Sequence, residues 1–159
     1  MADDAPQQAP ERGARSVLVT GGNRGIGRAI AAALVADGDR VVATYRSGSP
    51  EDVPAGALAV QADVTDTASV DAAFARAEAE HGPVEVLVAN AGMTRDQLVL
   101  RMRDEDFADV LDTNLTGAFR CVRRATKGMV RLRRGRVVLI SSVVGLYGSA
   151  GQTLSLIHI

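Results

Sequence analysis

The sequence predicts an α/β protein built on a doubly wound parallel sheet with helices on both faces. Three observations lead to this fold class: short β-branched apolar runs alternate with helical patterns, a glycine-rich turn follows the first run, and later runs end in small or polar residues. Without an internal repeat or an interdomain linker, residues 15–153 are predicted to form one domain. Residues 1–14 carry Asp, Ala and Pro without an apolar core, which predicts a disordered tail.

The first strand and the turn after it indicate a nucleotide site. Residues 17–19 are Val-Leu-Val, Thr20 leads into the glycine-rich turn, and apolar residues then recur at helical spacing. Glycine in such a turn permits positive φ, close approach of a ligand and close packing of helix on strand. A phosphate would lie on the N-terminal amides of the helix, unless the turn binds no ligand at all. The residues predicted to bind a dinucleotide here are Gly21, Asn23, Arg24, Gly25, Ile26 and Gly27.

The second strand is predicted at residues 40–45 and the third at 57–61, and candidate cofactor residues follow both. Tyr45 and Arg46 supply no carboxylate and one cation, which favours NADP over NAD because an arginine accommodates a 2′-phosphate. Asp63 and Val64 follow the third strand, where the aspartate is placed to accept a hydrogen bond from an adenine amino group. The alternatives are that Arg46 is a solvated loop residue and Asp63 a turn or cap residue.

The next helix and strand lead to a second candidate segment. Asp66 is predicted to cap a helix that ends at Gly82-Pro83. The fourth strand, residues 84–89, is nearly continuous in apolar residues, as a strand covered on both faces should be. It ends in Asn90, Ala91 and Gly92, whose small residues let a cofactor lie against the strand end while the asparagine side chain ties neighbouring strands.

Two helices and a fifth strand complete the pattern. The first helix, residues 104–112, is acidic and is predicted to turn Phe107, Val110 and Leu111 inward. The second is predicted to carry an apolar face and a basic face, and the basic face is either solvated, opposed to the acidic helix in a dimer, or a docking surface for an acidic partner. The apolar face is Leu115, Phe119, Val122, Thr126, Met129 and Val130, and the basic face is Arg120, Arg123, Arg124, Lys127, Arg131 and Arg134. The fifth strand, residues 136–140, runs into Ser141-Ser142.

Composition limits the possible functions. A net charge of −1 over 159 residues argues against a nucleic-acid-binding protein, because no global positive field would attract phosphates. The single cysteine, Cys121, has no second thiol with which to hold a metal, and we expect it to be a packing residue. The start of the chain resembles neither a signal peptide nor a membrane anchor, so we expect a cytoplasmic protein without a membrane span.

Four motifs occur in order at the predicted strand ends: Thr20-Gly-x3-Gly-x-Gly27, Asn90-Ala91-Gly92, Asn114 and Ser142. Together they resemble the short-chain dehydrogenase/reductase family. Residues 17–27, 84–92, 114–119 and 135–148 resemble more narrowly the bacterial β-ketoacyl-acyl carrier protein reductases, especially the actinobacterial ones. The resemblance covers roughly residues 15–153 and implies a Rossmann-type fold.

The resemblance also implies a reaction, which is hydride transfer from NADPH to a 3-oxoacyl thioester on acyl carrier protein in fatty-acid elongation. In the family a tyrosine donates the proton, a lysine lowers its pKa, a serine holds the substrate oxygen and an asparagine anchors a water. Ser142 matches the serine and Asn114 the asparagine, although a strand-end hydroxyl and a helix-kink cap are the plainer alternatives. Arg133, with Arg134 beside it, matches a residue that docks the acidic carrier protein. Family members pair through the two long helices after Gly92, commonly as tetramers.

The sequence departs from the family after Thr153. The register places Ser155 and Ile159 where the family has its tyrosine and lysine, and neither residue supplies that chemistry. Residues 154–159 resemble a translated sequencing-library adapter, and we interpret them as non-native. The expectation is therefore an amino-terminal fragment of the reductase, truncated after the fifth strand and inactive as written. Tyr147 is the one phenol in this region, and it follows Ser142 too closely to match the family's acid.

Two other functions stay open at this point. The first keeps the enzyme class but changes the substrate to an alcohol, a sugar or a steroid-like ketone. The second is a non-catalytic nucleotide-binding module, in which Ser155 and Ile159 are genuine residues of the chain. The acyl chain length and the oligomeric state lie beyond the sequence.

Overall fold

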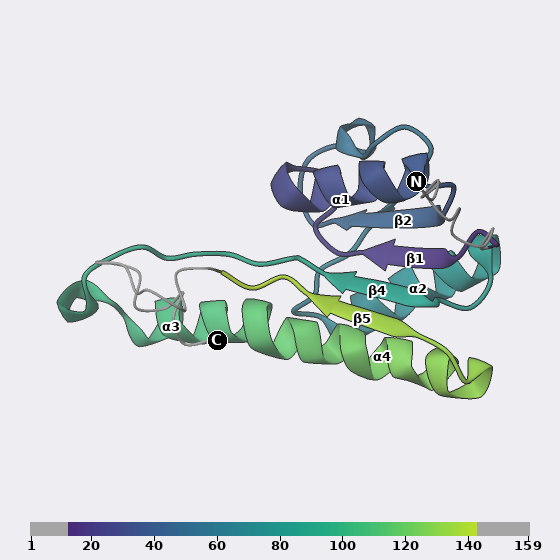
Figure 1. The fold of residues 1–159 in the computed structure, drawn as a ribbon. Helices are drawn as coiled ribbons and strands as arrows, with labels where there is room; N and C mark the ends of the chain where they lie inside the picture. Colours follow the sequence, from purple (N-terminus) through teal and green to yellow (C-terminus); the bar gives the residue numbers. More distant parts are fainter. Residues whose placement is uncertain (1–12, 143–159) are drawn as a thin grey trace, which may run out of the picture.

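The computed structural model describes residues 13–142, and these form one parallel sheet with helices on both faces (Figure 1). The strands are β1 (Ser16–Val19), β2 (Arg40–Tyr45), β3 (Leu58–Gln61), β4 (Val86–Ala89) and β5 (Arg136–Leu139). The helices are α1 (Gly25–Ala36), α2 (Thr67–His81), α3 (Asp104–Leu111) and α4 (Gly117–Leu132), with short turns η1 (Pro50–Asp52), η2 (Val99–Arg101) and η3 (Asp112–Thr116). The expectations for residues 1–12, Tyr147, Ser155, Ile159 and 154–159 lie outside the described residues.

The strand order is β3-β2-β1-β4-β5, and every neighbouring pair is parallel. The chain therefore builds outward from β1 in one direction and then crosses back to add β4 on the other side. This topology confirms the predicted doubly wound fold, in which ligands bind at the carboxyl edge between the two diverging strands. The predicted cap of α2 is also confirmed, because the Asp66 carboxylate accepts a hydrogen bond from the Ala68 amide at 2.9 Å.

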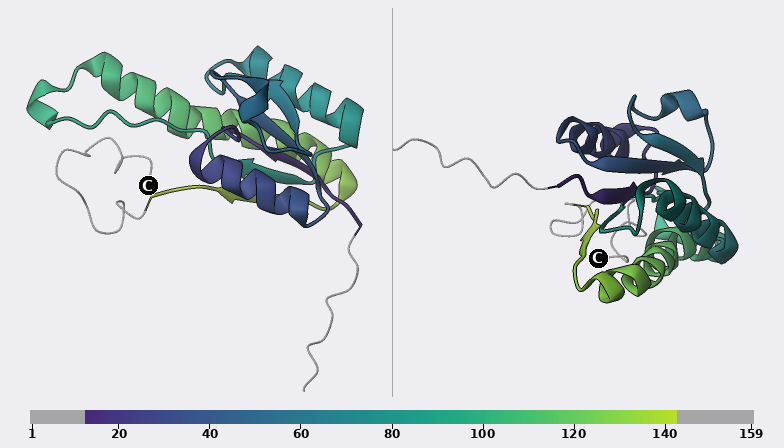
Figure 2. Two further views of the ribbon diagram at one scale, coloured as in Figure 1. Left: turned by 90° about the horizontal axis from the view of Figure 1, so that it is seen from above. Right: turned by 90° about the vertical axis from the view of Figure 1, so that its right-hand side faces the viewer.

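Alternate residues of β1 belong to two separate cores, one on each face of the sheet, and Figure 2 shows the helices that cover these two faces. Leu18 belongs to the core under α2 and α4, where Phe74 is the largest fully buried side chain. Its neighbours Val17 and Val19 belong to the core under α1. A strand covered on both faces needs apolar residues on both, which explains the continuous apolar runs of β1 and β4. Among residues 13–142, no helix has the length and apolar character needed to cross a membrane.

The structure buries only part of the apolar face that the sequence indicates for the segment of η3 and α4: Met129 is buried and Val122 packs against the core. Leu115, Phe119 and Val130 are more than half exposed, at 54%, 57% and 71%. The buried residues of α4 are instead spaced four apart, and they are Gly117, Cys121, Ala125 and Met129. These mostly small side chains let the helix approach its neighbours closely: a Cβ at position 117 would lie 2.8 Å from the Val64 Cγ2 atom. Burial raises the pKa of the Cys121 thiol to about 11, in keeping with its predicted packing role.

The predicted polar and apolar faces are also wrong at three further positions. Arg120 and Arg124, predicted to be solvated, point toward acidic partners, and each side chain is only 18% exposed. In α3, Val110 is buried as predicted, whereas Phe107 is exposed. The pattern in the sequence ranks side chains by polarity alone, but an arginine is buried readily when a carboxylate pairs with it.

Arg124 joins α4 to α2 through several contacts at once. Its Nη1 and Nη2 atoms donate to the two Glu78 carboxylate oxygens at 2.9 and 2.7 Å, and its Nε lies 3.4 Å from Asp71 Oδ1. The guanidinium also lies over the Phe74 ring, 5.2 Å from its centroid. The hydrogen bonds that Arg124 donates to Glu78 are the main reason that the pKa of Arg124 is raised.

We therefore expect Arg124→Ala to lower the free energy of unfolding by about 1.5–3 kcal/mol, because it removes bidentate charged hydrogen bonds and buried packing. The matched control is Arg123→Ala, whose exposed guanidinium lies over the exposed Phe119 ring, and it should change stability by less than about 0.5 kcal/mol. Urea unfolding followed by circular dichroism measures both variants. Similar losses for the two variants would contradict the assignment of Arg124 as the link between α2 and α4.

Candidate active site

Thr20 and Asn90 join the ends of β1 and β4. The Thr20 hydroxyl oxygen accepts hydrogen bonds from the amides of Asn90 and Ala91 at 3.0 and 2.9 Å. The Asn90 side-chain nitrogen donates to the carbonyl oxygens of Thr20 and Gly21 at 3.0 and 3.1 Å. The predicted role of Asn90 in tying neighbouring strands is thereby confirmed. These bonds place the glycine-rich turn and residues 90–92 together, at the point where the strand connections diverge.

The glycines of the turn have two different roles, positive φ at Gly21 and Gly25 and close packing at Gly27. Gly21 and Gly25 adopt φ of 65° and 52°, which other residues rarely adopt. Gly27 instead provides space, because a Cβ there would overlap the Gly21 carbonyl and the Asn90 amide. Arg24 precedes α1 without capping it through its side chain, so the first amides of the helix have no hydrogen-bond partner in the N-cap side chain. This arrangement fits a pyrophosphate.

The candidate residues after β2 and β3 lie at the same carboxyl edge of the sheet as the glycine-rich turn, because both strands run parallel to β1. Arg46 is exposed. The Asp63 Oδ1 atom accepts from the Thr65 amide at 2.9 Å and from the Thr65 hydroxyl at 2.7 Å. Burial alone would raise the pKa of Asp63, but these hydrogen bonds and the charges of Arg46 and Arg120 lower it below its usual value. Asp63 is therefore ionised at neutral pH and holds a local turn.

Val64 is placed differently from the other predicted cofactor residues. Its side chain is buried against the start of α4, and its carbonyl oxygen accepts a hydrogen bond from Arg120 at 3.4 Å. A ligand at this strand end would therefore meet the backbone of Val64 and not its side chain. The prediction that Asp63 and Val64 bind the adenine stays a prediction.

Asn114 lies in η3, a π-helical turn between α3 and α4 that the sequence did not predict. Its Oδ1 accepts from the Met93 amide at 2.8 Å, and its Nδ2 donates to the Met93 carbonyl at 2.9 Å. Because Met93 follows Gly92 directly, Asn114 lies beside residues 90–92. Turns of this type occur often at functional sites, since the extra residue re-aims a side chain.

Ser142 follows β5 at the same edge of the sheet. β4 and β5 pair from Val86 with Arg136 to Ala89 with Leu139, and the Ile140 amide then donates to the Ala89 carbonyl at 3.0 Å. Ser142 therefore comes two residues after the last hydrogen bond that β5 shares with β4. The structure brings its segment and Asn90 to one edge, as the order of motifs predicted.

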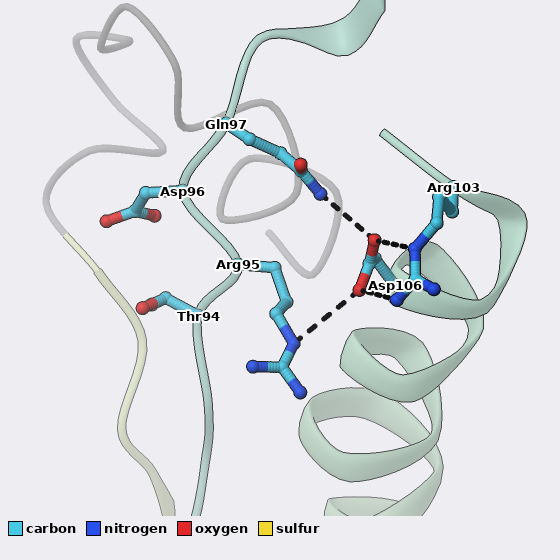
Figure 3. Close-up of a pocket in the computed structure, with 6 residues that line it drawn as sticks. All are labelled: Thr94, Arg95, Asp96, Gln97, Arg103 and Asp106. Carbon is cyan, nitrogen blue, oxygen red and sulfur yellow. Dashed lines mark hydrogen bonds and ion pairs between the residues drawn. The ribbon is translucent and has the colours of Figure 1, made fainter. Parts of the chain in front are cut away.

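Beyond this edge, residues 93–103 and α3 form an arm that extends past the sheet (Figure 1). Asp106 joins the two parts of the arm: it accepts from Arg103 at 3.0 and 3.1 Å and from Gln97 at 3.1 Å, and it lies 3.8 Å from Arg95. Figure 3 shows Arg95 and Gln97 pointing toward Asp106, whereas Thr94 and Asp96 turn away. Sequence reasoning missed this cluster because Asp106 lies in the acidic run 104–106, which by polarity alone is expected to face solvent. The one signal in the sequence is the spacing of three residues between Arg103 and Asp106.

The open hollow beside Asp106 has a volume of about 590 Å³. Its lining residues are Thr94, Arg95, Asp96, Gln97, Arg103 and Asp106. No predicted cofactor residue of the described chain lines it, so the candidate site remains the edge formed by the strand ends. Within residues 13–142, no cluster of three or more His, Cys, Asp or Glu side chains is arranged to hold a metal.

The two predicted docking arginines lie at the far end of α4 and differ in their contacts. Arg134 Nε forms an ion pair with Glu85 Oε2 at 2.8 Å. Arg133 ends the helix with φ of 52°, and no acidic side chain among residues 13–142 forms an ion pair with it. Of the two, Arg133 is therefore the better placed to meet an acidic partner.

Comparison with known proteins gives one family and a consistent set of relatives. Residues 15–154 match the model of the family described as short chain dehydrogenase. The chain is 50% identical over 139 residues to the 3-oxoacyl-[acyl-carrier-protein] reductase MabA of Mycobacterium avium, covering 87% of this chain and 53% of that protein. It is 52% identical to MabA of Mycobacterium tuberculosis strain H37Rv, with 87% and 55% covered. It is 43% identical over 148 residues to FabG of Staphylococcus aureus strain N315, with 87% and 60% covered.

The Asp106 cluster makes the stability of the arm depend on pH. The hydrogen bonds from Arg103 are the main reason that the pKa of Asp106 is lowered from 3.8 to about 2. A carboxylate with a lowered pKa stabilises the fold above its unfolded pKa, and this contribution is lost as pH falls toward the folded value. The gap in free energy of unfolding between the wild type and Asp106→Asn should be constant above about pH 5 and should narrow below about pH 4. Urea titrations across this range measure it, and a gap independent of pH would contradict the assignment.

Proposed function

Because this chain belongs to the short chain dehydrogenase family, we propose that the whole protein is an NADPH-dependent reductase of 3-oxoacyl thioesters on acyl carrier protein, acting in fatty-acid elongation. The Thr20–Asn90 junction carries the proposal, since it holds a phosphate cradle beside the strand end where a carbonyl would be reduced. The relatives are 3-oxoacyl-[acyl-carrier-protein] reductases, and this supports the substrate class. The chain spans about half the length of these relatives, so the activity is proposed for the whole protein.

The glycine-rich turn would bind the pyrophosphate of the cofactor, and the strand ends would bind the rest. Ile26, which is 65% exposed in the first turn of α1, lies at the rim of the cradle and would cover the bound dinucleotide. Arg46 would contact the 2′-phosphate, with Asp63 and the Val64 backbone at the adenine. Residues 90–92 would flank the nicotinamide half. When bound, the cofactor supplies the hydride.

Ser142 and Asn114 are the proposed polar residues of the reaction. The Ser142 hydroxyl would donate to the substrate carbonyl oxygen, where negative charge develops as the hydride arrives. Asn114 is fixed by both of its hydrogen bonds to Met93, and it would anchor a water that returns protons to the site. The tyrosine and lysine that complete such sites in the family are proposed to belong to the whole protein beyond residue 153.

Exposed apolar residues of η3 and α4 support assembly of copies of the protein. Leu115, Phe119 and Val130 are large apolar side chains that this chain alone leaves in contact with water. We propose that α4 pairs with the same helix of another copy, in a tetramer located in the cytoplasm. Pairing would remove apolar surface from water, which is the dominant favourable term in most protein association.

The cofactor assignment predicts the behaviour of Arg46→Ala in the whole protein. The wild type should oxidise NADPH with an acetoacetyl thioester, and the variant should raise the KM for NADPH about tenfold to a hundredfold, because one charged contact to the 2′-phosphate is lost. The kinetic constants with NADH should hardly change. Arg46 is exposed, whereas Tyr45 is buried beneath α1, so the test changes Arg46 alone.

Arg40→Ala is the matched control, since it removes an exposed arginine from the other end of β2. Its NADPH-to-NADH ratio should equal that of the wild type. An unchanged ratio in Arg46→Ala would contradict the assignment of Arg46. If the whole protein does not reduce this thioester but reduces another ketone, the result would favour an enzyme of the same class with a different substrate. If it only binds nucleotide tightly, the result would favour a non-catalytic nucleotide-binding module.

The docking assignment predicts that Arg133→Glu raises the KM for carrier-bound substrate several-fold, most strongly at low ionic strength, because exposed charges are screened by salt. A small thioester should be reduced as by the wild type. Glutamate carries the same backbone cost at φ of 52° as arginine does, so the change isolates the charge. The matched control is Arg101→Glu in η2, at the opposite end of the α3–α4 run. Equal losses on both substrates would instead indicate damage to the fold or to the active site.

A further inference from the structure

The loop that follows β2 is held by two side-chain amides from different parts of the sheet. Gln61, the last residue of β3, donates from Nε2 to the Arg46 carbonyl at 3.1 Å. Asn23, in the glycine-rich turn, donates from Nδ2 to the Ser47 carbonyl at 3.0 Å. Two successive carbonyl groups of an exposed loop are thus bound from opposite sides. Such bonds order a backbone that would otherwise depend on water alone.

Gln61 extends the hydrogen-bond ladder of the sheet by one carbonyl. Tyr45 pairs with Gln61 in the register of β2 and β3, and the Ala62 amide donates to the Tyr45 carbonyl at 2.8 Å. The backbone ladder between these strands ends there. The Gln61 side chain then donates a hydrogen bond to the carbonyl of Arg46, the residue that directly follows β2.

The chain turns immediately after the clamped residues. Gly48 adopts φ of 101°, and a Cβ there would lie 2.8 Å from Asp52 Oδ2 and 3.0 Å from Asn23 Nδ2. Asp52 in turn accepts from the Ser49 amide at 2.9 Å, and its carbonyl accepts from Arg28 Nε at 3.0 Å. The backbone is therefore fixed on both sides of residues 46–47. The Arg46 side chain itself is exposed, and the Gln61 bond to its carbonyl fixes the backbone from which the guanidinium extends.

We propose that Gln61 is a positioning residue for cofactor selection. It holds the Arg46 backbone so that the guanidinium meets a 2′-phosphate with little loss of freedom on binding. This inference rests on the proposed role of Arg46 as the 2′-phosphate contact. Fixing a binding group beforehand raises affinity because the ordering cost is removed from the binding step. The contribution of Gln61 should therefore appear only for ligands that carry the 2′-phosphate.

The test uses two ligands that differ by one phosphate, adenosine 2′,5′-bisphosphate and AMP, titrated calorimetrically into the whole protein. Gln61→Met keeps the side-chain length and removes the donor. It should weaken the bisphosphate about three- to tenfold, the effect of one neutral hydrogen bond, and change AMP by less than about twofold. The matched control is Arg40→Met, which also removes a side-chain bond to a backbone carbonyl, that of Ala14, and it should alter neither ligand.

A double variant separates positioning from a general structural effect. In an Arg46→Ala background, Gln61→Met should cause no further loss of bisphosphate affinity, because the group it positions is gone. Additive losses, equal losses for both ligands, or an unchanged bisphosphate-to-AMP ratio in Gln61→Met would each overturn the positioning role while leaving the proposed function intact. An unchanged ratio in Arg46→Ala would overturn the Arg46 assignment together with the inference built on it. Failure of the wild type to bind either ligand would overturn the nucleotide site itself.

Discussion

The hydrogen bonds between Thr20 and Asn90 are the constraint on which the candidate site depends. β1 and β4 are neighbours in the sheet, but the chain leaves β1 toward β2 and reaches β4 only after β3. The ends of β1 and β4 are therefore not joined by a short connection. The buried Thr20 hydroxyl accepts hydrogen bonds from two amides, and the Asn90 side-chain nitrogen donates hydrogen bonds to two carbonyl groups. Together these four bonds hold the two strand ends in one relative position. Gly27 must then lack a side chain, because the helix that carries it packs against this junction. The phosphate cradle and the strand end therefore form one rigid unit.

A second constraint acts through α4. Its small buried residues bring the helix close to β4 and α2. Gly117 lies so close to Val64 that a Cβ at position 117 would be 2.8 Å from the Val64 Cγ2 atom. The helix cannot rotate to bury Leu115 or Phe119 without forcing larger groups into that contact. The π-helical turn η3 directly precedes this contact and carries Asn114, which forms hydrogen bonds with Met93. The close helix packing at Gly117 and the proposed active-site amide of Asn114 thus lie next to each other in the chain.

The parts of the site that the sequence indicated are those encoded in a few consecutive residues. The glycine-rich turn, Asn90-Ala91-Gly92 and the Ser142 segment each follow a strand whose apolar run is unmistakable, and parallel strands bring their carboxyl ends to one edge. Contacts between distant polar side chains left no such trace. Arg124 with Glu78, Asp106 with Gln97, and Gln61 with the Arg46 carbonyl depend on which residues the fold brings within about 3 Å, and polarity alone predicts that all of them face water.

By itself the sequence determined the element order, the parallel doubly wound sheet and the position of the phosphate cradle. These features follow from local interactions. Runs of β-branched residues favour strands, glycine readily adopts the backbone angles of the turn, and a capping residue such as Asp66 directly precedes the helix that it caps. Only the tertiary structure decided which face of α4 is buried, how Asn114 is aimed and what holds Arg46 in place. A helix with apolar residues on more than one side has several faces that bury similar area. The choice among them falls to steric fit with β4 and α2, a property of three elements together that no single segment encodes.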